Sequence, residues 1–140
     1  MDPRELTAAE IVQLATIVNW WKQQRSWLLQ ADILRLDSHD EAILAEQHVT
    51  ATGDQFVVFA GVADSSSQIS PRPLPLNGLN AEAQYEINLV NRDELVSLSR
   101  GEMVIKIDKL TLSGSYLMNY GVTLPWQFPN VMWVLQGKIL

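Results

Sequence analysis

The 140-residue sequence contains no cysteine, and this absence excludes disulfide frameworks, thiolate zinc sites and thiol nucleophiles together. It also has no run of about 18 apolar residues, which a membrane-spanning helix would need. Basic residues are scarce, because ten Lys and Arg stand against sixteen Asp and Glu, for a net charge of −6. That sign opposes attraction to phosphate backbones and anionic lipids, so we expect neither nucleic acid nor membrane partners.

The remaining composition is typical of one packed domain. Hydrophobic residues make up 47% and charged residues 19% of a chain long enough to bury one core. Without disulfides, the stability of the fold must come from packing. The first residues, MDPRELTAAE, are acidic and lack the basic and apolar regions of a secretory signal, which favours a soluble cytoplasmic protein.

A long helix is predicted from Thr7 to about Gln30. The Thr7 hydroxyl can accept a backbone hydrogen bond at the helix start, and Glu10 can return one to the cap. At about 100° of rotation per residue, the apolar side chains of this helix fall on two faces. The broad face carries Ile11, Leu14, Ile17, Val18, Trp21, Leu28 and Leu29, and the nearly opposite stripe carries Trp20 and Trp27. One sheet cannot cover both, so the helix is expected to have a neighbour on each side.

After Asp32 the sequence changes to short β-rich runs separated by turn residues. Gly53 and Asp54 predict the turn of a hairpin, and the alternate prolines of PRPLPL predict an extended edge strand at 71–75. We therefore expect a mainly β fold, an antiparallel β-sandwich of about seven or eight strands preceded by one long N-terminal α-helix. The expected strands are 33–36, 46–52, 55–62, 71–75, 83–90, 103–108 and 131–136.

Catalytic and metal-binding patterns are weak throughout. The cluster Asp-Ser-His-Asp-Glu at 37–41 could hold a divalent ion, but it lacks ligand spacing and is better interpreted as a solvated loop. We expect His48 to be a solvent-facing or hydrogen-bonded strand residue and Ser113 to be a turn residue without a nucleophile elbow. The sixteen acids leave a glycosidase-type carboxylate pair open, although none can be named. No catalytic residue, cofactor or metal ligand is assigned.

Five tryptophans raise the possibility of a sugar-stacking surface. Four of them lie in the predicted helix or in the last strand, where Trp133 alternates with its neighbours, and packing is the stronger interpretation there. Trp126 lies in a loop between Pro125 and Gln127 and is the best candidate for an exposed ring. The candidate sugar-stacking residues are therefore Trp126, Tyr116 and Tyr120.

Two ordered segments carry a family resemblance. The segment LTLSGSYLMNYGVTLP at 110–125 joins a Leu-Ser-Gly turn to an apolar pair, a Gly and a Leu-Pro. The segment LPLNGLNAEAQYEINL at 74–89 contains Leu-x-Gly-Leu-x-x-x-Ala-x-Tyr. Together they resemble the C-terminal region of glycoside hydrolase family 36, the α-galactosidases. Residues 6–36, from Leu-Thr-x-x-Glu at 6–10 through Lys22, Arg25, Asp32, Arg35 and Leu36, are similar to the family's last barrel helix and exit strand. The segments 90–102 and 125–130 have no counterpart in it.

The resemblance implies a division into residues 1–30, the last helix of a (β/α)8 barrel missing from this chain, and residues 31–140, a C-terminal β-sandwich domain. Such a barrel needs about 250 residues. The family's two catalytic aspartates lie on the barrel, so the chain alone is expected to be inactive, while the parent protein that it resembles would be an α-galactosidase. The implied function is a non-catalytic accessory domain that supports the barrel, with a carbohydrate-binding module as the alternative.

Two further expectations follow from these assignments. Without the barrel, one apolar face of the helix loses its cover, so we expect a homo-oligomer through this helix, with Trp20 and Trp27 as interface residues. In the second segment, Leu79 and Tyr85 follow a turn at Gly78 and are expected to be core anchors of the sandwich.

Overall fold

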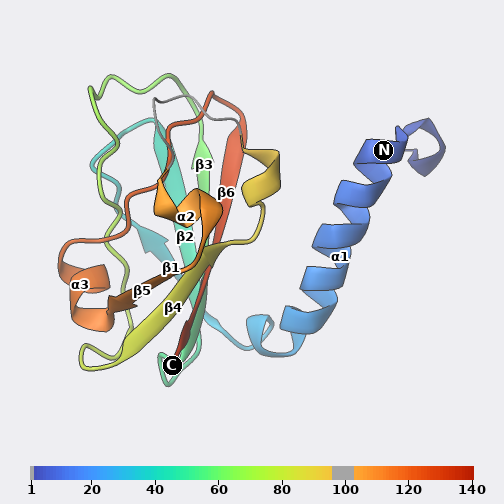
Figure 1. Ribbon diagram of the computed structural model, residues 1–140. Coiled ribbons are helices and arrows are strands. Elements are labelled where there is room, and N and C mark those ends of the chain that lie inside the picture. The colour runs from blue at the N-terminus through green and yellow to red at the C-terminus, as the bar shows by residue number, and fades with distance from the viewer. Residues whose placement is uncertain (1, 96–102) are drawn as a thin grey trace. The chain divides into compact units, whose positions relative to one another are not determined.

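The computed structural model describes residues 2–95 and 103–140 (Figure 1), so most of the segment 90–102 noted above lies outside the described residues. The chain forms two compact units, Met1–Gln30 and Ala31–Leu140. Each unit is described by itself below.

The first unit is a single long helix preceded by a short 3-10 turn. The turn η1 spans Pro3–Glu5 and the helix α1 spans Ala8–Leu28. The predicted capping box is confirmed, because Thr7 Oγ1 accepts a hydrogen bond from the Glu10 backbone at 3.3 Å and Glu10 Oε2 accepts one from the Thr7 backbone at 2.8 Å. Within the part of the chain that the structure describes, no helix is both long enough and apolar enough to cross a membrane.

The second unit is built on one antiparallel sheet, ordered β1-β2-β3-β6-β4-β5 (Figure 1). The last strand of the chain therefore lies in the middle of the sheet, between β3 and β4. This arrangement confirms a mainly β, antiparallel fold behind an N-terminal helix, and it confirms the predicted hairpin at Gly53. The strands are β1 Asp32–Leu36, β2 Ile43–Val49, β3 Gln55–Val62, β4 Gln84–Leu89, β5 Leu110–Ser113 and β6 Val131–Ile139.

The expected number of strands was too high, because the described residues contain six. Residues 71–75 pair with no strand among the described residues, where Leu74 alone forms a bridge, to Val122. Residues 103–108 were also assigned wrongly, since they contain a helical turn, α2 at Val104–Ile107. That turn directs one side chain, Ile105, into the core at 1% exposure. A further 3-10 turn, η2, spans Arg92–Glu94.

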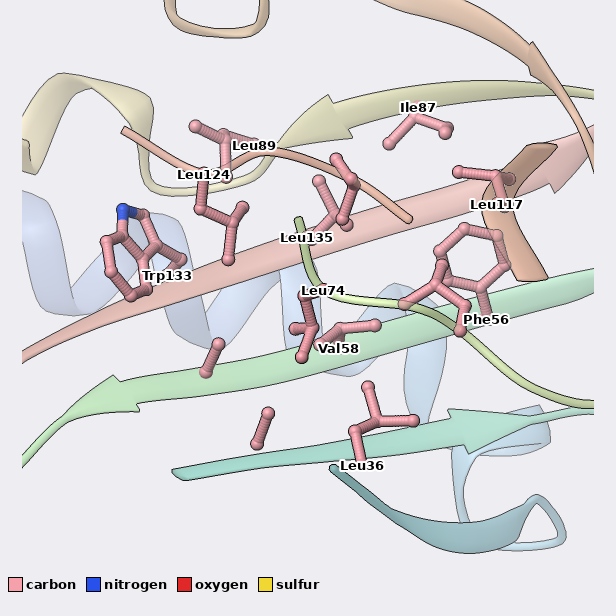
Figure 2. Packing of buried hydrophobic residues seen from close by; sticks show 14 of the residues in the cluster. Leu36, Phe56, Val58, Leu74, Ile87, Leu89, Leu117, Leu124, Trp133 and Leu135 are labelled. Carbon is pink, nitrogen blue, oxygen red and sulfur yellow. The ribbon is translucent and has the colours of Figure 1, made fainter. Parts of the chain in front are cut away.

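The core lies between the inner face of the sheet and a second layer made of extended segments and short helices. Figure 2 shows Phe56 and Val58 of β3 and Leu135 of β6 facing Leu74 and Leu117. The cross-strand register explains this face, because Val58 pairs with Leu135 and the side chains of alternate residues point to the same side. The second layer is formed by residues 71–79, α2, the helix α3 at Gly114–Asn119, and residues 121–124.

Buried polar side chains attach this second layer to the sheet. The Gln47 amide is fully buried and forms two bonds with the Asn77 backbone, donating to its oxygen at 2.7 Å and accepting from its nitrogen at 2.9 Å. The Tyr85 hydroxyl donates to the Gly53 carbonyl at 2.6 Å and accepts from the Asn80 nitrogen at 2.9 Å. Leu79 and Tyr85, at 9% and 0% exposure, are both buried, which confirms them as core anchors.

The Leu-Ser-Gly motif marks the junction between β5 and α3. Ser113 is the N-cap of α3, and its hydroxyl accepts a hydrogen bond from the Tyr116 backbone at 3.1 Å. A Cβ on Gly114 would lie 1.9 Å from the Asn80 carbonyl oxygen, so the backbone approach at this point requires glycine. The predicted turn at Ser113 therefore exists, and it is a turn into a short helix that the sequence did not predict.

Candidate functional site

The three aromatic residues predicted to stack on sugars occupy different environments. Tyr116 and Tyr120, one turn apart on α3, are 43% and 53% exposed, and their rings lie 4.9 Å apart at an interplanar angle of 39°. Trp126 is half-buried. Within residues 2–95 and 103–140 its ring has no aromatic contact with either tyrosine. The structure thus brings two of the three residues together, and they pack on each other at an angle instead of forming one coplanar surface.

A shallow pocket of about 180 Å³ lies beside Tyr116. Its lining is mostly apolar, and Tyr116 and Thr123 are the polar residues among those described. None of the described residues that line it is a carboxylate or an imidazole, so these residues supply no pair of groups for general acid and base catalysis. The sequence pattern did not predict this pocket, because residues 103–108 were expected to form a strand. The lining residues are Met103, Val104, Ile105, Leu110, Leu112, Tyr116, Gly121, Val122 and Thr123.

The acidic cluster at 37–41 is a structural element of the fold. Asp37, His39 and Glu41 are exposed, as expected of a solvated loop, whereas Asp40 is 2% exposed and departs from that expectation. Its Oδ1 accepts a hydrogen bond from the Ala42 backbone at 3.0 Å, and its Oδ2 accepts one from the Ser66 hydroxyl. A buried carboxylate needs such donors, and here they tie the β1–β2 turn to the loop at 63–68. Among the described residues, no three His, Asp or Glu side chains are grouped as metal ligands.

The remaining candidates from the sequence also occupy structural positions. His48 Nε2 lies 2.9 Å from Glu46 Oε1 on β2, and its ring meets Phe59 edge-on at 5.4 Å between centroids. His48 is thus the hydrogen-bonded strand residue that was expected. Ser113 uses its hydroxyl as the acceptor of the α3 cap. Trp133 is 2% exposed, which confirms its assignment to the core.

Shifted pKa values occur at exposed ion pairs and caps. The Lys109 ammonium donates to Glu86 Oε1 at 2.9 Å and lowers the pKa of that carboxyl below its ordinary value. The Thr7 backbone and hydroxyl lower the pKa of Glu10 in the same way. Both contacts stabilise the charged form of an exposed side chain, which is a structural effect and needs no catalytic explanation.

The two tryptophans predicted at an interface lie on one stripe of α1. Trp20 and Trp27 are both half-buried. The indole nitrogen of Trp27 donates to Gln24 Oε1 at 3.0 Å, and Gln24 lies between the two tryptophans along the helix. These contacts fix the Trp27 ring on its own helix, and the interface role of both residues stays a prediction.

Residues 43–138 match the family model described as the glycosyl hydrolase family 36 C-terminal domain. Among solved structures, the chain is similar to the α-galactosidase AgaA from Geobacillus stearothermophilus, with a TM-score of 0.75 and 21% identity over 100% of this chain. It is also similar to the galactosidase domain of the α-galactosidase-sucrose kinase AgaSK, with a TM-score of 0.76 and 19% identity over 100% of this chain. The α-galactosidase from Lactobacillus brevis gives a TM-score of 0.76 and 17% identity over the same 100%.

These solved structures are much longer than this chain. The chain covers 17% of AgaA, 17% of the AgaSK domain and 18% of the Lactobacillus brevis enzyme. At these identities the structural likeness shows a shared fold. A comparison with curated proteins found no match.

Proposed function

Because the chain belongs to glycosyl hydrolase family 36, as a C-terminal domain of that family, we propose that it is a non-catalytic accessory domain of an α-galactosidase-like glycoside hydrolase. Its role is to support the catalytic barrel of that enzyme. One observation carries the proposal: the whole chain corresponds to only 17% of an α-galactosidase such as AgaA. Most of such an enzyme lies outside the region that this chain matches, and a catalytic barrel of about 250 residues needs that additional length.

The chemistry of the described residues supports a non-catalytic role. The pocket beside Tyr116 has a mostly apolar lining, and the buried carboxylate of Asp40 accepts hydrogen bonds from Ala42 and Ser66. A retaining glycosidase needs two carboxyl groups about 5 Å apart around its substrate, one as nucleophile and one as acid and base. The accessory domain would therefore contribute packing surface, while the barrel contributes both carboxylates.

The proposed parent enzyme acts on α-galactosides. A variant of AgaA has been crystallised in complex with raffinose, which is an observation on that protein. We extend the substrate class to the parent of this chain because both share the family. A cytoplasmic location is also part of the proposal, supported by a composition without cysteine.

Oligomerisation through α1 completes the proposal. Several large apolar side chains of this helix are exposed, including Ile11 at 51% and Trp21 at 42%. Exposed apolar patches of this kind mark contact surfaces. The predicted interface residues Trp20 and Trp27 lie on the same helix.

A domain exchange tests the accessory role. The C-terminal region of AgaA that this chain matches would be deleted, and this chain would be fused in its place. We expect the deleted enzyme to lose soluble yield and resistance to heat, and the fusion to recover a measurable part of both. The native AgaA region serves as the positive control and an unrelated domain of similar length as the negative control. A fusion that behaves no better than the unrelated domain would contradict the accessory role.

A further inference from the structure

Asn77 and Gly78 form the one Asn-Gly pair in the sequence. The backbone nitrogen of the residue after an asparagine can attack the carbon of the side-chain amide, and glycine leaves that nitrogen unshielded because it has no side chain. The chain also contains its own comparison, because its six other asparagines precede residues that carry a side chain. These pairs are Asn19-Trp20, Asn80-Ala81, Asn88-Leu89, Asn91-Arg92, Asn119-Tyr120 and Asn130-Val131.

The atoms that would react in this pair make no hydrogen bonds. Asn77 and Gly78 are both exposed. Among the described residues, neither the Asn77 side-chain amide nor the Gly78 backbone nitrogen has a hydrogen-bond partner. By contrast, the Asn91 amide bonds to the β6 backbone at 2.7 and 3.0 Å, and the Asn119 amide donates to a carbonyl of α3 at 2.8 Å. Asn77 therefore combines the most reactive neighbour with an unrestrained side chain.

The backbone of Asn77 is held by Gln47. The buried Gln47 amide donates to the Asn77 oxygen at 2.7 Å and accepts from the Asn77 nitrogen at 2.9 Å. Attack by the Gly78 nitrogen closes a ring, and ring closure reorients the peptide group whose oxygen Gln47 holds. The reaction therefore depends on a local opening of this contact.

We propose that Asn77-Gly78 is a deamidation site, which loses ammonia through a cyclic imide at a rate that Gln47 restrains. The Gly78 nitrogen forms a bond to Asn77 Cγ, the bond from Cγ to Nδ2 breaks, and Nδ2 leaves as ammonia with the proton of the Gly78 nitrogen. Water then opens the ring at one of its two carbonyl carbons and leaves aspartate or isoaspartate. Water is the only other reactant, so the reaction goes beyond the accessory role and does not depend on it.

The isoaspartate product adds a carbon atom to the main chain at a closely packed point. Leu76 and Leu79, on either side of the pair, are buried at 0% and 9% exposure. The Gly78 backbone lies against the β2–β3 turn, because a Cβ on Gly53 would lie 2.7 Å from the Gly78 oxygen. A longer main chain cannot keep both leucines and the Gln47 contact in place together. Deamidation therefore weakens the attachment of the second layer to the sheet.

Incubation of the full chain at physiological temperature and pH measures the reaction. Peptide mass spectrometry over several weeks follows all seven asparagines, and fragmentation distinguishes isoaspartate from aspartate. We expect Asn77 to lose its amide at least about tenfold faster than each of the other six, because glycine alone leaves the attacking nitrogen unshielded. Loss at Asn77 that is no faster than at the other six would overturn the proposal.

Gln47→Leu tests the restraint. It removes both hydrogen bonds to the Asn77 backbone and should raise the rate of deamidation there about fivefold. Asp40→Ala is the matched control, because it removes buried hydrogen bonds elsewhere in the same unit and should leave the rate unchanged. A synthetic peptide of residues 74–81 lacks Gln47 and should also react faster than the folded chain, which keeps the restraint testable if Gln47→Leu does not fold. Equal rates in the peptide and the folded chain would refute the restraint, as would equal acceleration by the two substitutions.

Asn77→Asp separates the added charge from the longer main chain. Aspartate is one of the two products and leaves the main chain unchanged, so this variant should unfold at the same urea concentration as the unmodified chain. The isoaspartate fraction, separated chromatographically from the incubated chain, should unfold at a lower urea concentration than both. An isoaspartate fraction as stable as Asn77→Asp would show that the added carbon is accommodated and would overturn the predicted weakening.

Discussion

The Tyr85 hydroxyl offers the sharpest test of how the second layer is held on the sheet. Tyr85→Phe removes one oxygen atom from a side chain that is 0% exposed. The ring itself can stay in place, next to Phe56 at 5.9 Å between centroids. The substitution thus isolates the two hydrogen bonds of the hydroxyl from the packing of the ring.

The expected cost follows from the groups that are left behind. The Gly53 carbonyl loses a donor at 2.6 Å and the Asn80 nitrogen loses an acceptor at 2.9 Å. A buried polar group without a partner costs about 1–3 kcal/mol, so the pair should cost about 2–4 kcal/mol. With an m-value of about 1.5 kcal/mol/M, the midpoint of urea unfolding should fall by about 1–3 M at unchanged slope.

Urea unfolding followed by tryptophan fluorescence measures this shift. Tyr116→Phe is the control, because Tyr116 is 43% exposed and its loss of a hydroxyl should change the stability by less than about 0.5 kcal/mol. If Tyr85→Phe costs as little as the control, the two backbone groups find other partners, and the hydroxyl does not attach residues 77–80 to the sheet.

Four further predictions test other parts of the account. Gly121→Ala should lower the free energy of unfolding by at least about 3 kcal/mol, because φ is +108° and a Cβ would lie 2.4 Å from the Leu74 carbonyl carbon. Gly61→Ala is the control in the same thermal melt and should be tolerated, because a Cβ there would meet no atom closer than 3.9 Å. Asp40→Ala should cost about 1–3 kcal/mol and Ser66→Ala less, and a double-mutant cycle that finds no coupling between them would contradict the buried contact. Hydrogen bonds from Thr7 lower the pKa of Glu10 from its ordinary value of 4.5, so the charged Glu10 side chain should stabilise α1 fully above about pH 4.5. This stabilisation should disappear as the pH falls through the lowered pKa. Glu10→Gln should remove this pH dependence from the helical circular dichroism signal. Titration with raffinose or melibiose tests the predicted sugar-stacking residues, and a saturable NMR shift of the Tyr116, Tyr120 or Trp126 ring signals at millimolar sugar would establish binding that the accessory role does not require.

Local sequence patterns predicted correctly those features that depend on interactions between residues close together along the chain. The α1 cap joins Thr7 to a residue three positions away, and the β2–β3 hairpin turns at Gly53. In both cases the deciding interaction is local, so the residue types predict it. The mainly β, antiparallel fold class was predicted from several short β-rich runs separated by turn residues.

Interactions between distant segments decided the features that the sequence did not predict. Val104–Ile107 has the composition of a strand, but the chain forms one helical turn there and buries Ile105. Asp40 is buried because Ser66, 26 positions later, supplies a donor. The pocket beside Tyr116 is lined by α2, β5 and residues 121–123, and the sequence of each segment taken alone does not predict it. Tertiary packing overrode local propensity at each of these points.

The turnover of an aryl α-galactoside by the purified chain tests the central claim most directly. The chain would be separated from host enzymes by two unrelated chromatographic steps and assayed at high concentration beside intact AgaA. The account predicts no release of the aryl group above the level of an identically purified blank, because the described residues that line the pocket beside Tyr116 include no carboxylate. Release that follows the 15.8 kDa chain through both steps, at constant activity per mole, would contradict a non-catalytic accessory domain.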